Sequence, residues 1–529
     1  MKLLSSSIGR FLRSSLDGLE TTCKQLRQFT TSKALYKSKE FTSSLEAVKD
    51  IPSGSRLLVG GLGVCGLPSD LIKSLSETAI TDLTIVSSTC GIESFGLGWL
   101  FNKHMVKRVI SSYIDGNPEF IRQYFDGRVE LELIPQGTLA ERIRAAGAGI
   151  PAFYTQTGCS TVIESGGWPI KYKANGDVDI ISEPKESRLF DNTRYILEHA
   201  LNADFAFVKA WKGDKAGNLV FRKTARNFNA PMAKAAKVCI AEVEELCEVG
   251  TIDPDDVDLP GIYVHRIVRS SGEKPIERLV YAQSKEQFVP ASAARHRIAR
   301  RAALEFKDGM YVNLGIGIPS LCQLYIPNDI SVTLQSDVGI LGLGPYPKAG
   351  QEDPDLINAG KETVTVIPGA SYFSSDESFA MIRGFALTLC TVYFKKARQL
   401  YSGHLDMTVL GAMQVSCQGD FANWVVPRES VKGIGGAMDL ISSPKTKVIV
   451  CMEHLSKHGE PKIVSSCTLP ITGEKVVDMI ITEKCVFNVT KESGLVLTEL
   501  GEDVTLENVV QSTDCEFQVA DVVKPMKGS

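Results

Sequence analysis

The chain has 529 residues, which is too long for one ordinary domain and predicts at least two. Its formal net charge of −4 argues against nucleic acid as the main partner, and no apolar run approaches the roughly 18 residues of a transmembrane helix. The thirteen cysteines include no Cys-x-x-Cys pair and no His/Cys ligand spacing. We therefore expect reduced thiols and no metal site.

The first residues differ from the rest in composition. Residues 1–29 contain five Lys or Arg side chains against two acidic ones, and they are rich in Ser and Thr. Residues 8–13 could form a basic amphipathic helix, and residues 27–30 resemble a processing site. This composition is typical of a mitochondrial presequence, so we predict one at residues 1–38 and place the protein in the mitochondrial matrix. The alternative is a tail with no targeting role.

Two glycine loops begin similar segments in the two halves of the chain. Residues 54–68 and 309–319 each read as an apolar strand, a glycine-rich turn and a helix that starts at or after a proline. The strands expected next, at residues 82–88 and 329–336, both lead to Gly-Ile and then to Gly-Leu-Gly. The order of these features is the same in both halves.

A third pair of segments has matching spacing. One strand is expected to begin at Asp204 and another at Asp406, and in each case an alanine follows after six residues and a glycine after thirteen. Those glycines belong to Gly217-Asn218 and Gly419-Asp420, which indicate hairpin turns.

Three correspondences in one order predict an α/β protein with two homologous domains and mainly parallel sheets. We place the domains at residues 39–272 and 293–521, joined by a polar linker at 273–292. The second domain opens with a basic segment, residues 295–304. We interpret it as an amphipathic helix with a solvated charged face, and expect Ile298, Ala302 and Leu304 to point inward; nucleic-acid binding is the alternative.

The glycine loops are candidates for ligand binding. Gly61, Gly63 and Gly66 match the dinucleotide-binding fingerprint formally, but Asp82 begins the next strand instead of ending it, and the loop at Gly315 lacks the spacing. We therefore set a nicotinamide site aside. Glycine allows backbone to approach a ligand closely, and free N–H groups can bind a phosphate or an oxyanion. Tight turns required only for packing are the alternative. The candidate binding residues are Gly60, Gly61, Gly63, Gly315 and Gly317.

Seven short segments match one known family. They are residues 60–68, 136–144, 149–154, 225–229, 313–319, 342–347 and 374–381. Together they resemble the 3-oxoacid transferases of the class I coenzyme A transferase family over about residues 40–520. The resemblance implies the CoA-transferase fold, with an alpha-subunit-like and a beta-subunit-like half in one chain. It also implies a homodimer that moves CoA from succinyl-CoA to acetoacetate in ketone-body use, with CoA as a substrate and no other cofactor.

The nucleophile motif of that family is altered in this chain. The family reads Ser-Glu-Asn-Gly, and its glutamate forms a mixed anhydride and then a thioester with CoA. Here Asp337 and Val338 occupy the glutamate and asparagine positions. Residues 432–439 resemble the segment in which the family places an oxyanion donor, and we assign that role to Gly436.

The shorter carboxylate of Asp337 leaves three functions open. It would place its oxygens more than about 1 Å short of a glutamate, and a shift of that size can cost on the order of 100-fold in rate. The chain is then a transferase with reduced activity, an acyl-CoA hydrolase in which Asp337 activates water, or a non-catalytic CoA-binding subunit.

Eighteen residues, 385–402, interrupt a segment that is continuous in the family. They contain no Gly, Pro, Asn or Asp, although a surface loop normally does. Our hypothesis is a retained intron in the gene model; otherwise the insert must bulge outward or disturb the strand that follows it.

Overall fold

The computed structural model describes residues 38–272, 274–282, 293–384, 404–427, 430–490 and 494–527. Residues 40–529 form one compact unit. The predicted presequence lies outside the described residues except for Ser38, and the insert at 385–402 lies outside them entirely. Most of the predicted linker does so as well.

The first half of the chain forms a mainly parallel sheet around buried apolar strands. The central strand contains Leu57, Leu58 and Val59, none of which is exposed, as expected for a parallel sheet covered on both faces. In spatial order the sheet comprises β13 (Arg266–Arg269), β12 (Ala236–Cys247), β10 (Ala203–Asp214), β1 (Arg56–Val59), β2 (Leu83–Thr89), β3 (Val106–Tyr113) and β4 (Glu130–Leu133), with β11 (Leu219–Val220) antiparallel to β10.

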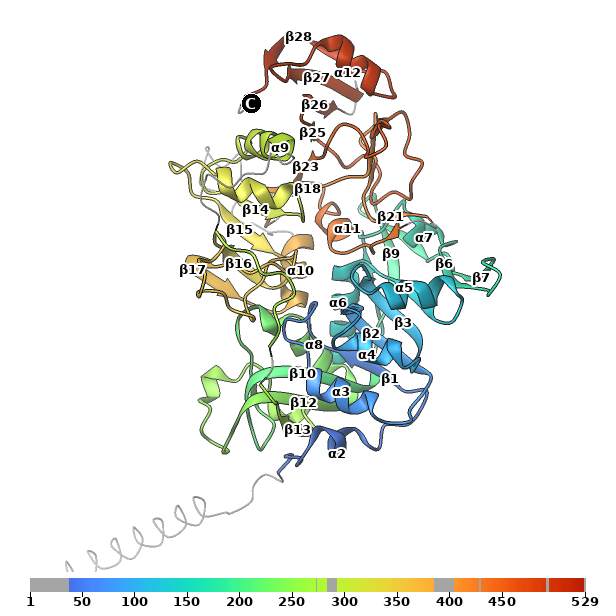
Figure 1. Cartoon of the computed structure of the whole chain (residues 1–529), viewed down its shortest axis with the longest axis vertical. Coiled ribbons are helices and arrows are strands. Elements are labelled where there is room, and N and C mark those ends of the chain that lie inside the picture. Colours follow the sequence, from blue (N-terminus) through green and yellow to red (C-terminus); the bar gives the residue numbers. More distant parts are fainter. Residues whose placement is uncertain are drawn as a thin grey trace, which may run out of the picture. The chain divides into compact units, whose positions relative to one another are not determined.

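The second half forms a longer mixed sheet (Figure 1, yellow to red). In spatial order it comprises β17 (Val366–Tyr372), β16 (Ile340–Leu343), β15 (Thr333–Ser336), β14 (Tyr311–Leu314), β18 (Met407–Leu410), β23 (Lys447–Cys451), β25 (Met479–Ile481), β26 (Cys485–Thr490), β27 (Gly494–Leu500) and β28 (Gln518–Pro525). The five strands from β15 to β25 are parallel to one another.

The pairing of strands confirms that the two halves share one plan. In the first half β1 lies between β2 and β10, and Leu57 is opposite both Ile85 and Phe205. In the second half β14 lies between β15 and β18, and Val312 is opposite both Leu334 and Met407. These are the strands that the sequence paired. Both predicted hairpins also form, β10 with β11 and β19 (Gln414–Ser416) with β20 (Phe421–Ala422).

Helices and small sheets cover the two large sheets. The helices are α2 (Ser44–Val48), α3 (Ser69–Ser76), α4 (Leu97–Asn102), α5 (Pro118–Phe125), α6 (Gln136–Gly147), α7 (Val162–Ser165), α8 (Asn229–Lys234), α9 (Ala293–Ala303), α10 (Ser375–Arg383), α11 (Ala437–Leu440) and α12 (Leu506–Ser512). The shorter strands are β5 (Ala152–Thr155), β6 (Pro169–Tyr172), β7 (Val178–Ile181), β8 (Ser187–Phe190), β9 (Thr193–His199), β21 (Val425–Val426), β22 (Ser430–Val431) and β24 (Ile463–Val464). The turn after Pro319 is a 3-10 helix, Pro319–Tyr325, whereas α3 follows Pro68 directly.

The basic segment predicted at residues 295–304 forms α9, with two departures from expectation. Ile298 and Ala302 are fully buried as predicted, but Leu304 is 48% exposed because the helix ends at Ala303. Its charged face is not wholly solvated either. Arg301 is buried and bonded to Glu499 at 2.7 Å, which a linear pattern could not show because Glu499 comes from β27.

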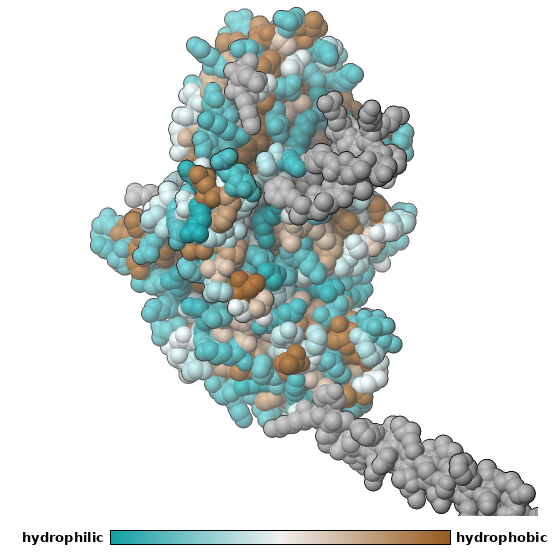
Figure 2. Space-filling model, turned by 180° about the vertical axis from the view of Figure 1, so that it is seen from behind, coloured by the Kyte–Doolittle hydropathy of each residue, from teal (hydrophilic) through white to brown (hydrophobic). Residues whose placement is uncertain are grey.

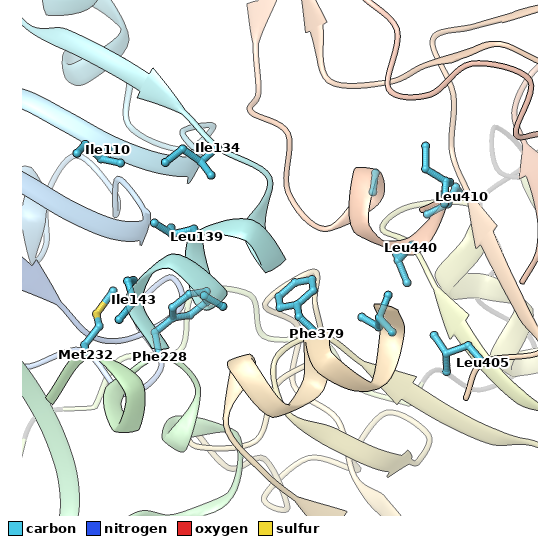
Figure 3. Packing of buried hydrophobic residues seen from close by; sticks show 14 of the residues in the cluster. Ile110, Ile134, Leu139, Ile143, Phe228, Met232, Phe379, Leu405, Leu410 and Leu440 are labelled. Carbon is cyan, nitrogen blue, oxygen red and sulfur yellow. The ribbon is translucent and has the colours of Figure 1, made fainter. Parts of the chain in front are cut away.

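One hydrophobic core joins the two halves. Its largest cluster includes Leu139 and Ile143 of α6 from the first half and Phe379 of α10 and Leu440 of α11 from the second. Figure 3 shows Phe379 between these two groups of side chains. On the face shown in Figure 2, hydrophobic residues lie in small separate groups among hydrophilic ones. Within the described ranges, no helix has both the length and the apolar content needed to cross a membrane.

A buried carboxylate lies where the two halves meet. Asp439 of α11 is fully buried and accepts hydrogen bonds from the Gly137 backbone at 2.8 Å and the Thr157 hydroxyl at 3.2 Å, both from the first half. It also pairs with Arg383 at 3.3 Å. Beside it, the Gln136 N–H donates to the carbonyl of Gly435 at 2.9 Å. These contacts fix the segment around residue 435 against the start of α6.

Replacing Asp439 by Ala should destabilise the protein by about 3 kcal/mol, because the Arg383 charge and the Gly137 N–H lose their buried acceptor. The midpoint of urea denaturation measures this loss. Asp126→Ala is the matched control, since Asp126 pairs with Arg122 on an exposed helix and should leave the midpoint nearly unchanged. Equal shifts in the two variants would contradict the role of Asp439 at the junction.

Candidate active site

A cavity of about 510 Å³ lies between the two halves. It lies at the carboxyl ends of neighbouring parallel strands, because Gly315 follows β14, Asp337 follows β15, Gly411 follows β18 and Met452 follows β23. Ligands of open α/β sheets bind at this edge. The first half closes the cavity with residues that include Thr89, Tyr113 and Gln136.

Asp337 lies in the turn between β15 and β16. The turn comprises Asp337, Val338 and Gly339, and it is closed by the Gly339 N–H bonding to the Ser336 carbonyl at 3.1 Å. Gly339 has a φ of +104°, and a Cβ there would collide with the Phe373 carbonyl, so only glycine fits. The turn directs the Asp337 side chain into the cavity, where the residue is 8% exposed.

Burial changes the acidity of Asp337. Loss of hydration raises the pKa of this carboxyl from its usual value near 3.8 to about 6, the buried Asp439 carboxylate adds to the rise, and a hydrogen bond from Ser336 opposes it. A carboxylate with few compensating donors keeps its electron density and is a better nucleophile or base than a solvated one.

Gly436 lies directly against the Asp337 carboxylate. A Cβ added at Gly436 would be 3.0 Å from Oδ2 of Asp337 and 3.2 Å from the ring of Phe379. Gly436 caps α11, the short helix that carries Asp439. Two residues predicted from the sequence to act together are therefore neighbours in one cavity.

Val338 has no access to the cavity. Its side chain is fully buried in an apolar cluster with Leu62, Val312 and Ile340. An amide at this position would lie among hydrocarbon side chains and would need a partner there. Valine therefore suits the packing of this turn.

The candidate glycines fall into two groups. Gly315 and Gly317 line the cavity. Gly60, Gly61 and Gly63 are buried beside it, while Leu62 of the same loop reaches its wall. A Cβ at Gly60 would collide with the side chain of Asn229, so close packing already requires glycine at that position.

A lysine that the sequence did not single out contributes charge to the cavity. Lys361 is buried, pairs with Glu277 at 2.6 Å and lies 5.6 Å from the centre of the Tyr113 ring. Its φ of +63° is unusual for a side-chain-bearing residue, and such strain is concentrated at functional sites. Nothing in the linear sequence signals this conformation.

Four further cations line the cavity, Arg278, Arg295, Lys432 and Lys462. Arg295 pairs with Glu453 at 3.2 Å. For the other three, no ion pair forms with any residue that the structure describes. In the same described ranges no group of three His, Cys, Asp or Glu side chains is arranged to hold a metal.

A family model for coenzyme A transferase matches residues 41–270, 295–392 and 398–512. The match breaks inside the segment 385–402 that the sequence marks as an insertion. Human succinyl-CoA:3-ketoacid coenzyme A transferase 2, mitochondrial, is 49% identical over 529 residues, which is 100% of this chain and 99% of that protein.

Another relative corresponds to the first half alone. It is one of the separate subunits of a probable succinyl-CoA:3-ketoacid coenzyme A transferase of Mycobacterium tuberculosis, and it is 50% identical over 241 residues, 45% of this chain and 97% of the relative. Among solved structures, the acyl-CoA transferase of Escherichia coli O157:H7 superposes with a TM-score of 0.73 at 21% identity, covering 93% of this chain and 96% of that one. This likeness shows the fold.

Asp337→Asn should stabilise the protein at neutral and higher pH. The unfolded chain loses the Asp337 proton near pH 3.8 and the folded protein only near pH 6, so stability falls as the pH rises through this window and the loss is complete above it. The difference corresponds to about 3 kcal/mol. Denaturation midpoints of wild type and variant should diverge between pH 4 and pH 7; a constant offset would contradict the raised pKa.

Proposed function

Because the chain belongs to the coenzyme A transferase family of enzymes, we propose that it transfers CoA from succinyl-CoA to a 3-oxoacid such as acetoacetate. One observation carries this proposal. Although Asp337 is a methylene shorter than the family's glutamate, its carboxylate still lies in the cavity and against Gly436. The names of the curated relatives support the choice of substrates and a mitochondrial location, for which we propose the matrix.

The proposed chemistry has two half-reactions. The Asp337 carboxylate attacks the thioester carbonyl of succinyl-CoA and expels CoA thiolate, which leaves a succinyl-aspartyl anhydride. The thiolate then attacks the aspartyl carbonyl, releasing succinate and forming an aspartyl-CoA thioester. Acetoacetate enters and the steps reverse, giving acetoacetyl-CoA and free Asp337. Covalent catalysis of this kind conserves the thioester energy while the acids exchange.

The residues around Asp337 suit these steps. Each attack places negative charge on a carbonyl oxygen, and the backbone N–H of Gly436 is the donor we propose for it. The cavity closes between two halves, which limits the water that would hydrolyse the anhydride. Lys361 is the most buried cation of the cavity, and we propose that it attracts the free carboxylate of the acid. We further propose that no cofactor besides CoA is required and that the enzyme is a homodimer in ketone-body use.

A second candidate is acyl-CoA hydrolysis. The raised pKa of Asp337, about 6, is typical of a general base, and a shorter side chain leaves room for a water molecule. In that case Asp337 would remove a proton from water instead of attacking the thioester itself.

One assay distinguishes these functions. Purified protein incubated with succinyl-CoA and acetoacetate should form acetoacetyl-CoA, and Asp337→Glu should raise this rate by at least about tenfold because it restores the family's reach. Release of free CoA at a rate independent of acetoacetate would instead identify a hydrolase. If neither product forms with wild type or with the glutamate variant, the chain is non-catalytic.

Gly436→Ala should lower turnover by roughly 10- to 100-fold, because its methyl group would crowd Oδ2 of Asp337. The φ of −86° at Gly436 is accessible to alanine, so the backbone is not strained. Gly411→Ala is the control: it lines the same cavity, but its Cβ would meet nothing nearer than 3.9 Å. Equal rates for the two variants would remove Gly436 from the proposed mechanism.

A further inference from the structure

One end of the cavity carries a lysine with no ion-pair partner among the residues that the structure describes. Lys462 lies in the loop between β23 and β24, and its backbone is held on both sides, by its N–H to the His454 carbonyl at 3.3 Å and by its carbonyl to the Val415 N–H at 2.9 Å. Its side chain is half-buried and lines the cavity. A rigid backbone therefore presents this ammonium group to whatever occupies the cavity.

The charge of Lys462 is poorly compensated by the protein. Glu453 and Glu483 flank it, but neither forms an ion pair with it within the part of the chain that the structure describes. Glu453 pairs with Arg295, and Glu483 accepts the His454 N–H at 2.9 Å. Loss of hydration lowers the pKa of Lys462 to about 8, the direction expected for a cation that lacks its anion. A bound anion would restore the missing interaction.

Arg295 lies close enough to influence the same group. It lines the cavity from α9 and acts electrostatically on Lys462. Its bond to Glu453 uses Nε. An anion between the two side chains would contact one cation from α9 and one from the loop before β24.

The distance from Asp337 to this end of the cavity matches the length of a CoA molecule. Asp337 follows β15, while the loops next to Lys462 follow β18 and β23, which are two and three strands away in the sheet. At about 4.8 Å per strand the separation is about 10 to 14 Å. The extended pantetheine arm separates the sulfur of CoA from its first phosphorus by roughly 15 Å.

We propose that Lys462, assisted by Arg295, binds the pyrophosphate of CoA and thereby places the sulfur at Asp337. This inference rests on the proposed function for the identity of the ligand. It assigns a specificity role to Lys462, which would favour CoA thioesters over thioesters that lack a nucleotide.

The test compares three thioesters with the full chain: succinyl-CoA, succinyl-dephospho-CoA and succinyl-pantetheine. Lys462→Met should raise the KM of the first two by about tenfold, since each keeps the pyrophosphate, and leave those of succinyl-pantetheine and acetoacetate unchanged. Lys462→Arg should restore most of the loss. Lys457→Met, which removes an exposed lysine from the neighbouring loop, is the control and should change none of these values.

The outcomes separate a phosphate contact from other roles. An effect on succinyl-CoA alone would assign Lys462 to the 3′-phosphate and overturn the pyrophosphate assignment. An equal effect on succinyl-pantetheine would indicate a structural role and overturn the proposal. Calorimetric binding of CoA and pantetheine gives a readout without turnover. If wild type shows no transfer, yet the methionine variant loses affinity for CoA and not for pantetheine, the proposed function fails and this inference stands.

Discussion

The buried carboxylate of Asp439 fixes the geometry on which the cavity depends. It carries charge in a place without water and is satisfied by a backbone N–H and a hydroxyl from one half of the chain and by a guanidinium from the other. Burial nevertheless raises its pKa, so the network is not a simple source of stability. Its value is positional. Because Gly436 caps the same short helix, fixing Asp439 also fixes Gly436 relative to Asp337.

A second buried carboxylate so close to the first has a cost and a use. Asp337 has a single weak hydroxyl contact at 3.4 Å, and the charge of Asp439 opposes its ionisation. An uncompensated carboxylate destabilises the folded state, but it reacts more readily with an acyl group than a well-solvated one does. The tight junction between halves makes this environment possible because it excludes solvent. Stability is reduced at the residue where reactivity is needed, as in many active sites.

Much of the architecture could be predicted from the sequence, because its signals are local. Apolar runs followed by glycine turns located β1 and β14, and equal spacing after Asp204 and Asp406 paired β10 with β18. The motif at Asp337 marked a turn after a strand, and the structure shows that turn. Leu304 was wrong because the exact end of a helix depends on contacts beyond the pattern.

The remainder of the site depends on long-range contacts and carried no linear signal. Lys361 reaches the cavity through a strained turn, and Lys462 comes from a loop between two strands. Arg295 was visible only as one charge in a basic helix. The pKa of Asp337 depends on burial and on Asp439, which lies about a hundred residues further along the chain.

The central claim is that Asp337 is the covalent carrier of CoA. The most direct measurement is mass spectrometry of the protein after incubation with succinyl-CoA alone, followed by peptide mapping. The account predicts a CoA adduct on the peptide containing Asp337, lost on addition of acetoacetate and absent from Asp337→Asn. Transfer to acetoacetate that proceeds without an adduct at Asp337, or that persists in Asp337→Asn, would contradict it.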